Sequence, residues 1–356
     1  MKQRSAIANC TDDNTELIQM LNKRLFDTFD QDATLGLAKG KIGFCFFAFW
    51  MAKHEKNENY RKIAEILLND VSEKVVTMQI IDLMDGLAGI GLTIRYLLKE
   101  SYVKGNPNSI LYDIDDMIFK QLSYSKSLNN ISTLSVIQIL FYLYIRIYDQ
   151  KKGSESEYLY QELIIATVNY IYQKTDASFF EEPSSFNMNY LLPQFLFVLS
   201  KIYRLNFYNY RIIKIIEEIS LKALSTLPIL HANQLYLMWG MDSVLQKVNM
   251  KGWDYHIHLL KEHLDIDIIF DDELRSRNIY VDNGFGGIYI LLSAMQKYFS
   301  KSEILRWMTK IISRIESSDV WLLMEQDPEY LQQNRGLLSG LCGVSMVLAD
   351  AKSKFT

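Results

Sequence analysis

Hydrophobic positions along this chain follow two kinds of helical pattern. In the first kind, apolar residues recur every three or four positions, as over 14–31, where Leu17, Leu21 and Leu25 share one face. The same two-faced pattern predicts helices over 59–78, 110–122, 157–173, 210–223, 253–264 and 302–315. In the second kind, runs such as 44–50 and 90–98 are apolar on almost every side. A two-faced helix lies at a surface, whereas a helix that is apolar all round is surrounded by other helices.

The all-apolar runs open on a repeated motif of two glycines three positions apart. The motif is intact at Gly40–Gly43, Gly86–Gly89, Gly284–Gly287 and Gly340–Gly343. Degenerate copies begin at 135, 191 and 237, so the seven starting positions, 40, 86, 135, 191, 237, 284 and 340, are separated by 46 to 56 residues. A fixed period of this length indicates a repeat architecture, here seven helical hairpins.

Seven hairpins can form an open solenoid or a closed ring. An open solenoid needs polar terminal repeats, and the last run, 344–348, is as apolar as those in mid-chain. We therefore predict an all-α fold, an α/α toroid of seven inner and seven outer helices. It would occupy 14–356 as a single domain after an N-terminal tail, 1–13. Glycine at each entry turn would leave room where the inner helices converge.

The composition limits the class of protein but indicates no particular reaction. The chain has 356 residues, 49% of them hydrophobic, which is enough for a large core, and a formal net charge of −4, which does not attract nucleic acid. The polar first fifteen residues lack the apolar segment of a signal peptide. The longest apolar stretch, 42–52, is about half a membrane span. Three scattered cysteines form no disulfide framework. We expect a soluble cytoplasmic protein.

The residues that precede the motifs are candidates for binding. If every inner helix starts at its motif, seven helix N-termini with free amides surround one mouth of the ring. Six of the seven preceding residues can form hydrogen bonds; the set is Lys39, Asp85, Leu134, Tyr190, Tyr236, Asn283 and Ser339. Polar N-caps are common at any single helix, but the set as a whole favours a binding surface. Arg335, in the loop before the seventh motif, is either a clamp for a carboxylate or phosphate or a solvated loop residue.

The repeated helices, such as Asp85-Gly-Leu-Ala-Gly-Ile-Gly-Leu92 and Ser339-Gly-Leu-Cys-Gly-Val-Ser345, resemble the lanthionine synthetase C-like family, the cyclases of lanthipeptide maturation. The resemblance covers about 15–348 and implies an α/α toroid. It also implies thioether chemistry, in which zinc activates a substrate cysteine thiolate that adds to a dehydrated serine or threonine. The family's zinc ligands are a cysteine in the fifth repeat and a Cys-His pair in the sixth, and a histidine in the fourth repeat is a candidate for proton transfer.

The chain departs from that pattern at every one of these positions. The fifth-repeat ligand falls on Leu235, the Cys-His pair becomes Asp282-Asn283, and the family histidine becomes Tyr190. Tetrahedral zinc needs at least three protein ligands, usually nitrogen or sulfur. We therefore expect no zinc and no other cofactor. A hard cation held by Asp282, Asn283 and Asp85 is the weaker alternative. Histidines 256, 258 and 263 are expected on the surface of one outer helix, and His231 ahead of the fifth inner helix.

Three functions remain open. The leading hypothesis is a zinc-free family member that binds a peptide or protein segment of a peptide-maturation system without cyclising it. The alternative is a carbohydrate-active enzyme that uses Asp85 and Asp282, with Glu325 and Asp327 in the loop before the seventh motif as further carboxylates. The purely structural interpretation of Asp85 and Asp282 is that they are helix N-caps. A helical adaptor that uses its outer face is a third possibility, which the lack of a large apolar patch in the outer-helix pattern disfavours.

Overall fold

The computed structural model describes residues 16–27, 34–123 and 130–355. Within these ranges every regular element is a helix and no strand occurs. The chain divides into two compact units. Unit 1 comprises 1–73 and 270–356, and unit 2 comprises 74–269. None of the described helices has the length and apolarity that crossing a membrane requires.

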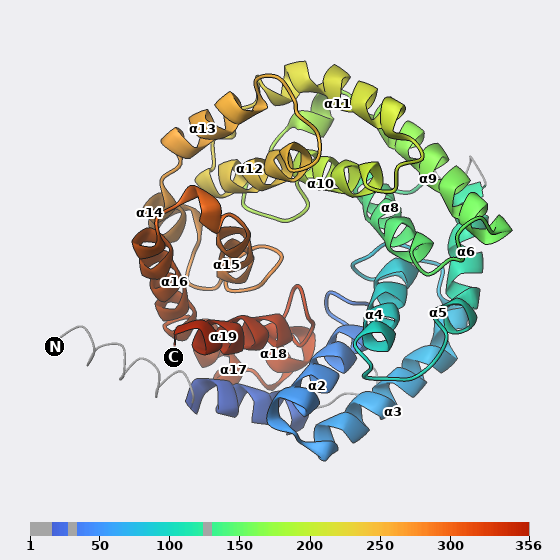
Figure 1. Ribbon diagram of the computed structural model, residues 1–356. Coiled ribbons are helices and arrows are strands. Elements are labelled where there is room, and N and C mark those ends of the chain that lie inside the picture. Colours follow the sequence, from blue (N-terminus) through green and yellow to red (C-terminus); the bar gives the residue numbers. More distant parts are fainter. Residues whose placement is uncertain (1–15, 28–33, 124–129, 356) are drawn as a thin grey trace. The chain divides into compact units, whose positions relative to one another are not determined.

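Unit 2 is built from two layers of helices (Figure 1). The motif helices, those that follow the glycine motif or its degenerate copies, pack in sequence order; they are α4 (Leu87–Lys99), α8 (Thr133–Ile147), α10 (Leu191–Tyr203) and α12 (His231–Leu245). Each packs against a two-faced helix; these are α6 (Tyr112–Ser123), α9 (Glu155–Gln173), α11 (Asn209–Ala223) and α13 (Trp253–His263). Short elements connect them, namely η1 (Val75–Thr77), α5 (Pro107–Ile110), η2 (Ala177–Phe180) and α14 (Ile266–Ile268).

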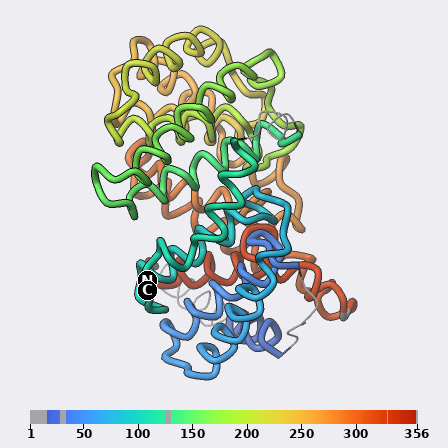
Figure 2. The backbone as a smooth tube through the Cα atoms, turned by 90° about the vertical axis from the view of Figure 1, so that its right-hand side faces the viewer, coloured from blue at the N-terminus to red at the C-terminus, as the bar shows by residue number. Residues whose placement is uncertain are grey.

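Unit 1 holds the remaining motif helices, α2 (Lys41–Glu55), α15 (Phe285–Ala294) and α19 (Leu341–Phe355). Helix α19 packs on both α2 and α15, and Figure 2 shows the blue α2 beside the red α19. The two-faced helices of this unit are the helix over 16–27, α3 (Glu58–Lys74) and α16 (Lys301–Glu316). Shorter elements are η3, a π-helix (Ile269–Glu273), η4 (Gln296–Tyr298), α17 (Val320–Gln326) and α18 (Pro328–Gln333). Glu325 therefore lies on a helix, not in the loop that the sequence predicted.

The helices predicted from the apolar pattern are confirmed, with one misplaced start. The two-faced helix predicted over 157–173 is observed as Glu155–Gln173, and that over 253–264 as Trp253–His263. The predicted ends at 14–15 and 28–31 lie outside the described residues. The fifth motif helix, α12, begins at His231, six positions before the predicted start. The first turns of α12 contain the polar residues Asn233 and Gln234, which are nevertheless buried. The apolar pattern therefore did not reveal this part of the helix.

The loops before the four intact motifs share one backbone arrangement. The first amide of each motif helix donates to the carbonyl seven residues earlier, as in Lys41 to Thr34, Leu87 to Ile80, Phe285 to Asn278 and Leu341 to Asn334. Each loop thus folds back and caps its own helix with carbonyl oxygens. The prediction of free amides at these N-termini is wrong, because the loop itself accepts their hydrogen bonds.

Candidate functional site

Backbone hydrogen bonds join three of the motif loops in unit 1. The Leu338 and Ser339 amides both donate to the Ala38 carbonyl at 3.2 Å, and the Val281 and Asp282 amides both donate to the Leu338 carbonyl at 3.1 Å. The loop of the seventh motif therefore contacts those of the first and the sixth. We call the four candidates that these contacts bring together the loop cluster: Lys39, Asp282, Asn283 and Ser339.

Asp282 is a partly buried carboxyl of the loop cluster. Its Oδ2 atom accepts a hydrogen bond from the Ser339 hydroxyl, while its Oδ1 atom is buried and accepts none in the described structure. Burial raises the pKa of this carboxyl above its ordinary value, against the opposing effects of the Ser339 hydrogen bond and the Lys39 charge. The Oδ1 atom of Asn283 is likewise buried without a hydrogen bond. Lys39 is exposed, so the cluster presents a cation outside and acceptor oxygens inside.

Arg335 belongs to the same loop as Ser339 but is buried. Only 4% of its surface is exposed, and its guanidinium carbon lies 5.4 Å from the centroid of the Phe44 ring. The expectation of a solvated loop arginine is wrong, because the guanidinium packs over an aromatic face, an arrangement that stabilises a cation away from water. Its use as a clamp for a carboxylate or phosphate stays a prediction.

Tyr190 and Tyr236 come together in unit 2. Tyr190 immediately precedes α10, as predicted, whereas Tyr236 lies in the second turn of α12 and not before the helix. Their rings are 6.5 Å apart at an interplanar angle of 70°, and both side chains are buried. The Tyr236 hydroxyl donates to the Met188 carbonyl at 3.2 Å, and the Tyr190 hydroxyl is buried without a hydrogen bond. Burial raises the pKa of both hydroxyls, so both remain protonated at neutral pH.

Glu182 is a residue of this region that the sequence analysis missed. Its carboxylate accepts hydrogen bonds from the Ile229 amide at 2.5 Å, the Leu230 amide at 3.3 Å and the Asn233 side chain at 3.0 Å. It therefore occupies the N-terminal end of α12. A sequence signal for such a residue would be the N-cap position Leu230, which has no acceptor side chain and so leaves the first amides of α12 to an acceptor from elsewhere.

The N-cap interpretation of Asp85 and Asp282 is wrong. The N-cap residues of α4 and α15 are Gly86 and Gly284, and neither helix start has a side-chain cap. Asp85 is exposed, and its amide donates to the Asp82 carboxylate at 2.8 Å within its own loop. Asp85 belongs to unit 2 and Asp282 to unit 1. The carbohydrate-active function and the cation site that would need both carboxylates stay predictions.

The side chains at the three positions that the resemblance assigns to zinc ligands are poor donors for zinc. Leu235 is fully buried and has no lone pair to offer, the Asp282 carboxylate is bonded to Ser339, and Asn283 provides an amide. Among the described residues no three His, Cys, Asp or Glu side chains come close enough to hold a metal ion.

The histidines do not supply the missing donors. His256, expected at the surface, is buried and hydrogen-bonds to the Thr226 carbonyl at 3.1 Å. His231 is the first residue of α12, not a residue ahead of it, and accepts the Asp265 amide at 3.1 Å. Both imidazoles thus have a local structural partner.

Compared with solved structures, the chain matches nisin cyclase over 98% of its own length and 96% of that protein, with a TM-score of 0.60 and 15% sequence identity. The chain shares the nisin cyclase fold. This match confirms the predicted fold class, an all-α α/α toroid. No family model and no curated protein sequence matches the chain. At 15% identity the likeness to nisin cyclase concerns the fold, so the chemistry must be argued from this chain's own residues.

Proposed function

We propose that this chain is a lanthionine synthetase C-like protein that binds a peptide segment without zinc and without cyclising it. The fold shared with nisin cyclase supports a role in peptide modification. The observation that carries the rest of the proposal is the replacement of three donors at once, by Leu235, Asp282 and Asn283. A buried aliphatic side chain at the first position cannot bind a metal, and two oxygen donors make a poor zinc site.

Without the metal, a substrate thiol has to be activated by a side chain of the protein itself. A cysteine thiol has an ordinary pKa of about 8.5, and only its thiolate adds to an alkene at a useful rate. The chain's own described cysteines, Cys45 and Cys342, are buried, and burial raises the pKa of both thiols. Tyr190 and Tyr236 remain protonated at neutral pH, so neither can act as the base. We therefore expect binding without thioether formation.

The loop cluster is the proposed contact surface for the peptide. Lys39 offers an exposed ammonium to a carboxylate or carbonyl oxygen, while Asp282 and Asn283 hold acceptor oxygens that a peptide N–H can reach if their side chains turn outward. The backbone bonds among the three loops fix the spacing of these groups. The bound peptide segment is either a free peptide or part of a folded partner protein of a peptide-maturation system.

A synthetic peptide that carries one dehydroalanine and one cysteine tests this function. Adding the S–H bond across the alkene leaves the mass unchanged, so free thiols are counted by alkylation and mass spectrometry. We expect a fluorescein-labelled version to bind by anisotropy, while its thiol disappears no faster with the protein than in buffer. Lys39→Gln should weaken binding about tenfold, as loss of one charge-assisted hydrogen bond does. Catalysed loss of the thiol contradicts the absence of cyclisation, and absence of binding contradicts the peptide partner.

A further inference from the structure

Unit 2 has a partly exposed surface on its motif helices. Figure 1 shows α8, α10 and α12 as one layer of this unit and α9, α11 and α13 as the other. In the middle of α10 a single stripe reaches the solvent. Gln194, Phe197 and Lys201 recur at spacings of three and four and are partly exposed, while the residues between them are buried. This stripe is therefore the side of α10 that its neighbouring helices leave uncovered.

Aromatic rings connect this stripe to the helices on either side. The Phe197 ring stacks on Trp239 of α12, with centroids 4.5 Å apart and planes inclined by 23°. On the other side its centroid lies 5.8 Å from that of Phe141 on α8. Trp239 and Phe141 are partly exposed, as Phe197 is. Three neighbouring helices thus present one row of rings, each with some apolar surface in contact with water.

Three cations lie at the end of this row that the helix C-termini form. The Lys201 ammonium lies 4.5 Å from the centroid of the Phe197 ring, and the exposed Arg204 and Lys247 directly follow the last turns of α10 and α12. Burial and the charges of Arg204 and Lys247 lower the pKa of Lys201, so the three groups are close enough to repel one another. Within the described part of the chain, none of the three forms an ion pair with a carboxylate.

We propose that this surface binds an acidic peptide segment that also carries aromatic or aliphatic side chains. We call it the aromatic–cation face; it comprises Phe141, Phe197, Trp239, Lys201, Arg204 and Lys247. Carboxylates of the segment pair with the three cations and relieve their repulsion, while its apolar side chains pack on the rings. The inference rests on the proposed function only in taking the ligand to be a peptide, because the loop cluster belongs to unit 1 and this face to unit 2.

The packing of the rings favours a peptide over a nucleotide. Phe197 is stacked on Trp239 and contacted by the Lys201 ammonium, and all three rings of the row are partly buried. None of them offers the open face on which a base stacks. A peptide, in contrast, can place successive side chains against several partly exposed rings, and carboxylates repeated along it can reach cations on two helices.

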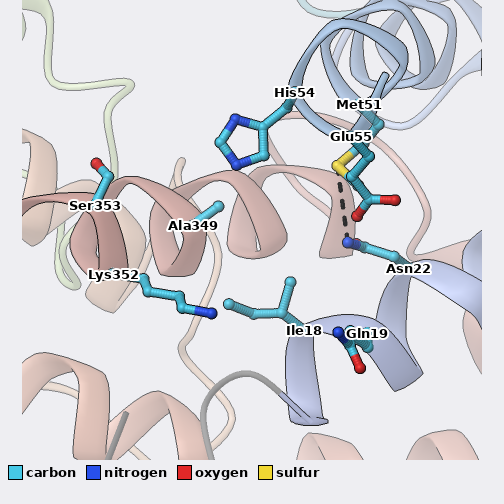
Figure 3. A pocket seen from close by; sticks show the side chains of 9 residues that line it. All are labelled: Ile18, Gln19, Asn22, Met51, His54, Glu55, Ala349, Lys352 and Ser353. Carbon is cyan, nitrogen blue, oxygen red and sulfur yellow. Dashed lines mark hydrogen bonds between the residues drawn. The ribbon is translucent and has the colours of Figure 1, made fainter. Parts of the chain in front are cut away.

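Charge distinguishes the aromatic–cation face from the pocket of unit 1. That pocket has a volume of about 400 Å³ and is lined by side chains of both charges, among them the exposed Glu55 (Figure 3). A lining of both charges favours neither an anionic nor a cationic ligand. The aromatic–cation face carries positive charge alone and therefore favours an anionic one.

Fluorescence anisotropy of the full chain with short labelled peptides tests the proposal. In the probe, aspartate alternates with phenylalanine; one control has lysine in place of aspartate, and the other has glycine in place of phenylalanine. We expect the probe to bind saturably, and each control to bind at least about tenfold more weakly. No saturable binding of the probe up to about 1 mM, or equal binding of the glycine control, overturns the proposal. A labelled oligothymidylate that binds as tightly as the probe also overturns it, because the face would then select charge alone.

Variants place the site. Lys201→Gln and Lys247→Gln should each weaken binding of the probe about fivefold. Lys222→Gln removes the same charge from an exposed position on α11 and should leave the affinity unchanged. Thermal unfolding of each variant controls for folding, and the exposed Lys247 decides alone if Lys201→Gln is unstable. Parental affinity in a folded Lys247→Gln variant overturns the proposal.

Lys39→Gln separates this face from the loop cluster. If Lys39→Gln weakens binding of the probe and Lys247→Gln does not, the probe binds at the loop cluster and the aromatic–cation face is not its site. If only Lys247→Gln weakens binding, the aromatic–cation face is the site of the probe. Failure of the dehydroalanine peptide to bind, with the acidic probe still bound, contradicts the proposed function of the loop cluster and leaves this face supported.

Discussion

The glycine before each intact motif helix lies against the carbonyl oxygens of its own loop. A Cβ atom at Gly284 would overlap the Asn278 carbonyl, and one at Gly86 would lie 2.7 Å from the Ile80 oxygen. The backbone of Gly284 is extended, with a φ of −154°, so close approach and not a left-handed conformation requires glycine there. The glycine repeat therefore marks the loops that cap the helices.

Replacing Gly284 by alanine should destabilise the chain by about 3 kcal/mol, because the loop must shift and lose its hydrogen bonds to α15. Gly286→Ala, at the second residue of α15, is the milder comparison, since its Cβ would lie 3.1 Å from the Ile279 oxygen, whereas a Cβ at Gly284 would lie closer still to the Asn278 oxygen. The smaller overlap at Gly286 should cost less than the one at Gly284. Urea denaturation compares the two variants, and equal stability would contradict the capping role.

Asp282 should make stability depend on pH in a defined direction. Its folded-state pKa is raised by burial, so its contribution to stability is full below the ordinary value of about 4 and is lost as the pH rises through the folded-state pKa. Asp282→Asn keeps the neutral form at every pH and can still accept the Ser339 hydrogen bond. The melting temperature of this variant relative to the parent should therefore rise between about pH 4 and pH 7. A difference that stays constant would show that the carboxyl is not perturbed.

The motif helices do not all start in the same way. The four intact copies are capped by their own loops, α8 is capped by the Ser132 side chain, and α12 depends on Glu182 from a distant loop. Gly240, within the degenerate fifth motif, lies against Pro193 of α10, where a Cβ would be 2.7 Å from the Pro193 Cα. In that copy glycine serves the packing between two helices instead of a turn.

Glu182→Ala should destabilise the chain by about 2 kcal/mol, because two backbone amides and the Asn233 side chain lose a charged acceptor. Glu181→Ala changes the exposed neighbour and should cost less than about 0.5 kcal/mol. Chemical denaturation measures both. A similar effect of the two substitutions would mean that Glu182 does not hold the start of α12.

For the whole molecule, the repeat pattern was sufficient to predict the helices and the fold class. Period, apolar runs and glycines are all local features, so six of the seven motif helices could be located within a few residues, whereas α12 begins six positions before its predicted start. Contacts between residues far apart in the sequence could not be predicted in the same way. Nothing in the sequence indicated that the first, sixth and seventh loops share hydrogen bonds, that Arg335 packs on Phe44, or that Glu182 reaches α12, because each joins residues far apart in the chain.

Zinc content tests the central claim most directly. The purified chain is dialysed against about one equivalent of zinc, separated from free metal and measured by elemental analysis with protein quantified in the same sample. A catalytic site of three nitrogen or sulfur donors retains its zinc under this treatment, whereas Leu235, Asp282 and Asn283 offer no such set. We expect far less than one zinc per chain. One tightly held zinc per chain would contradict the account.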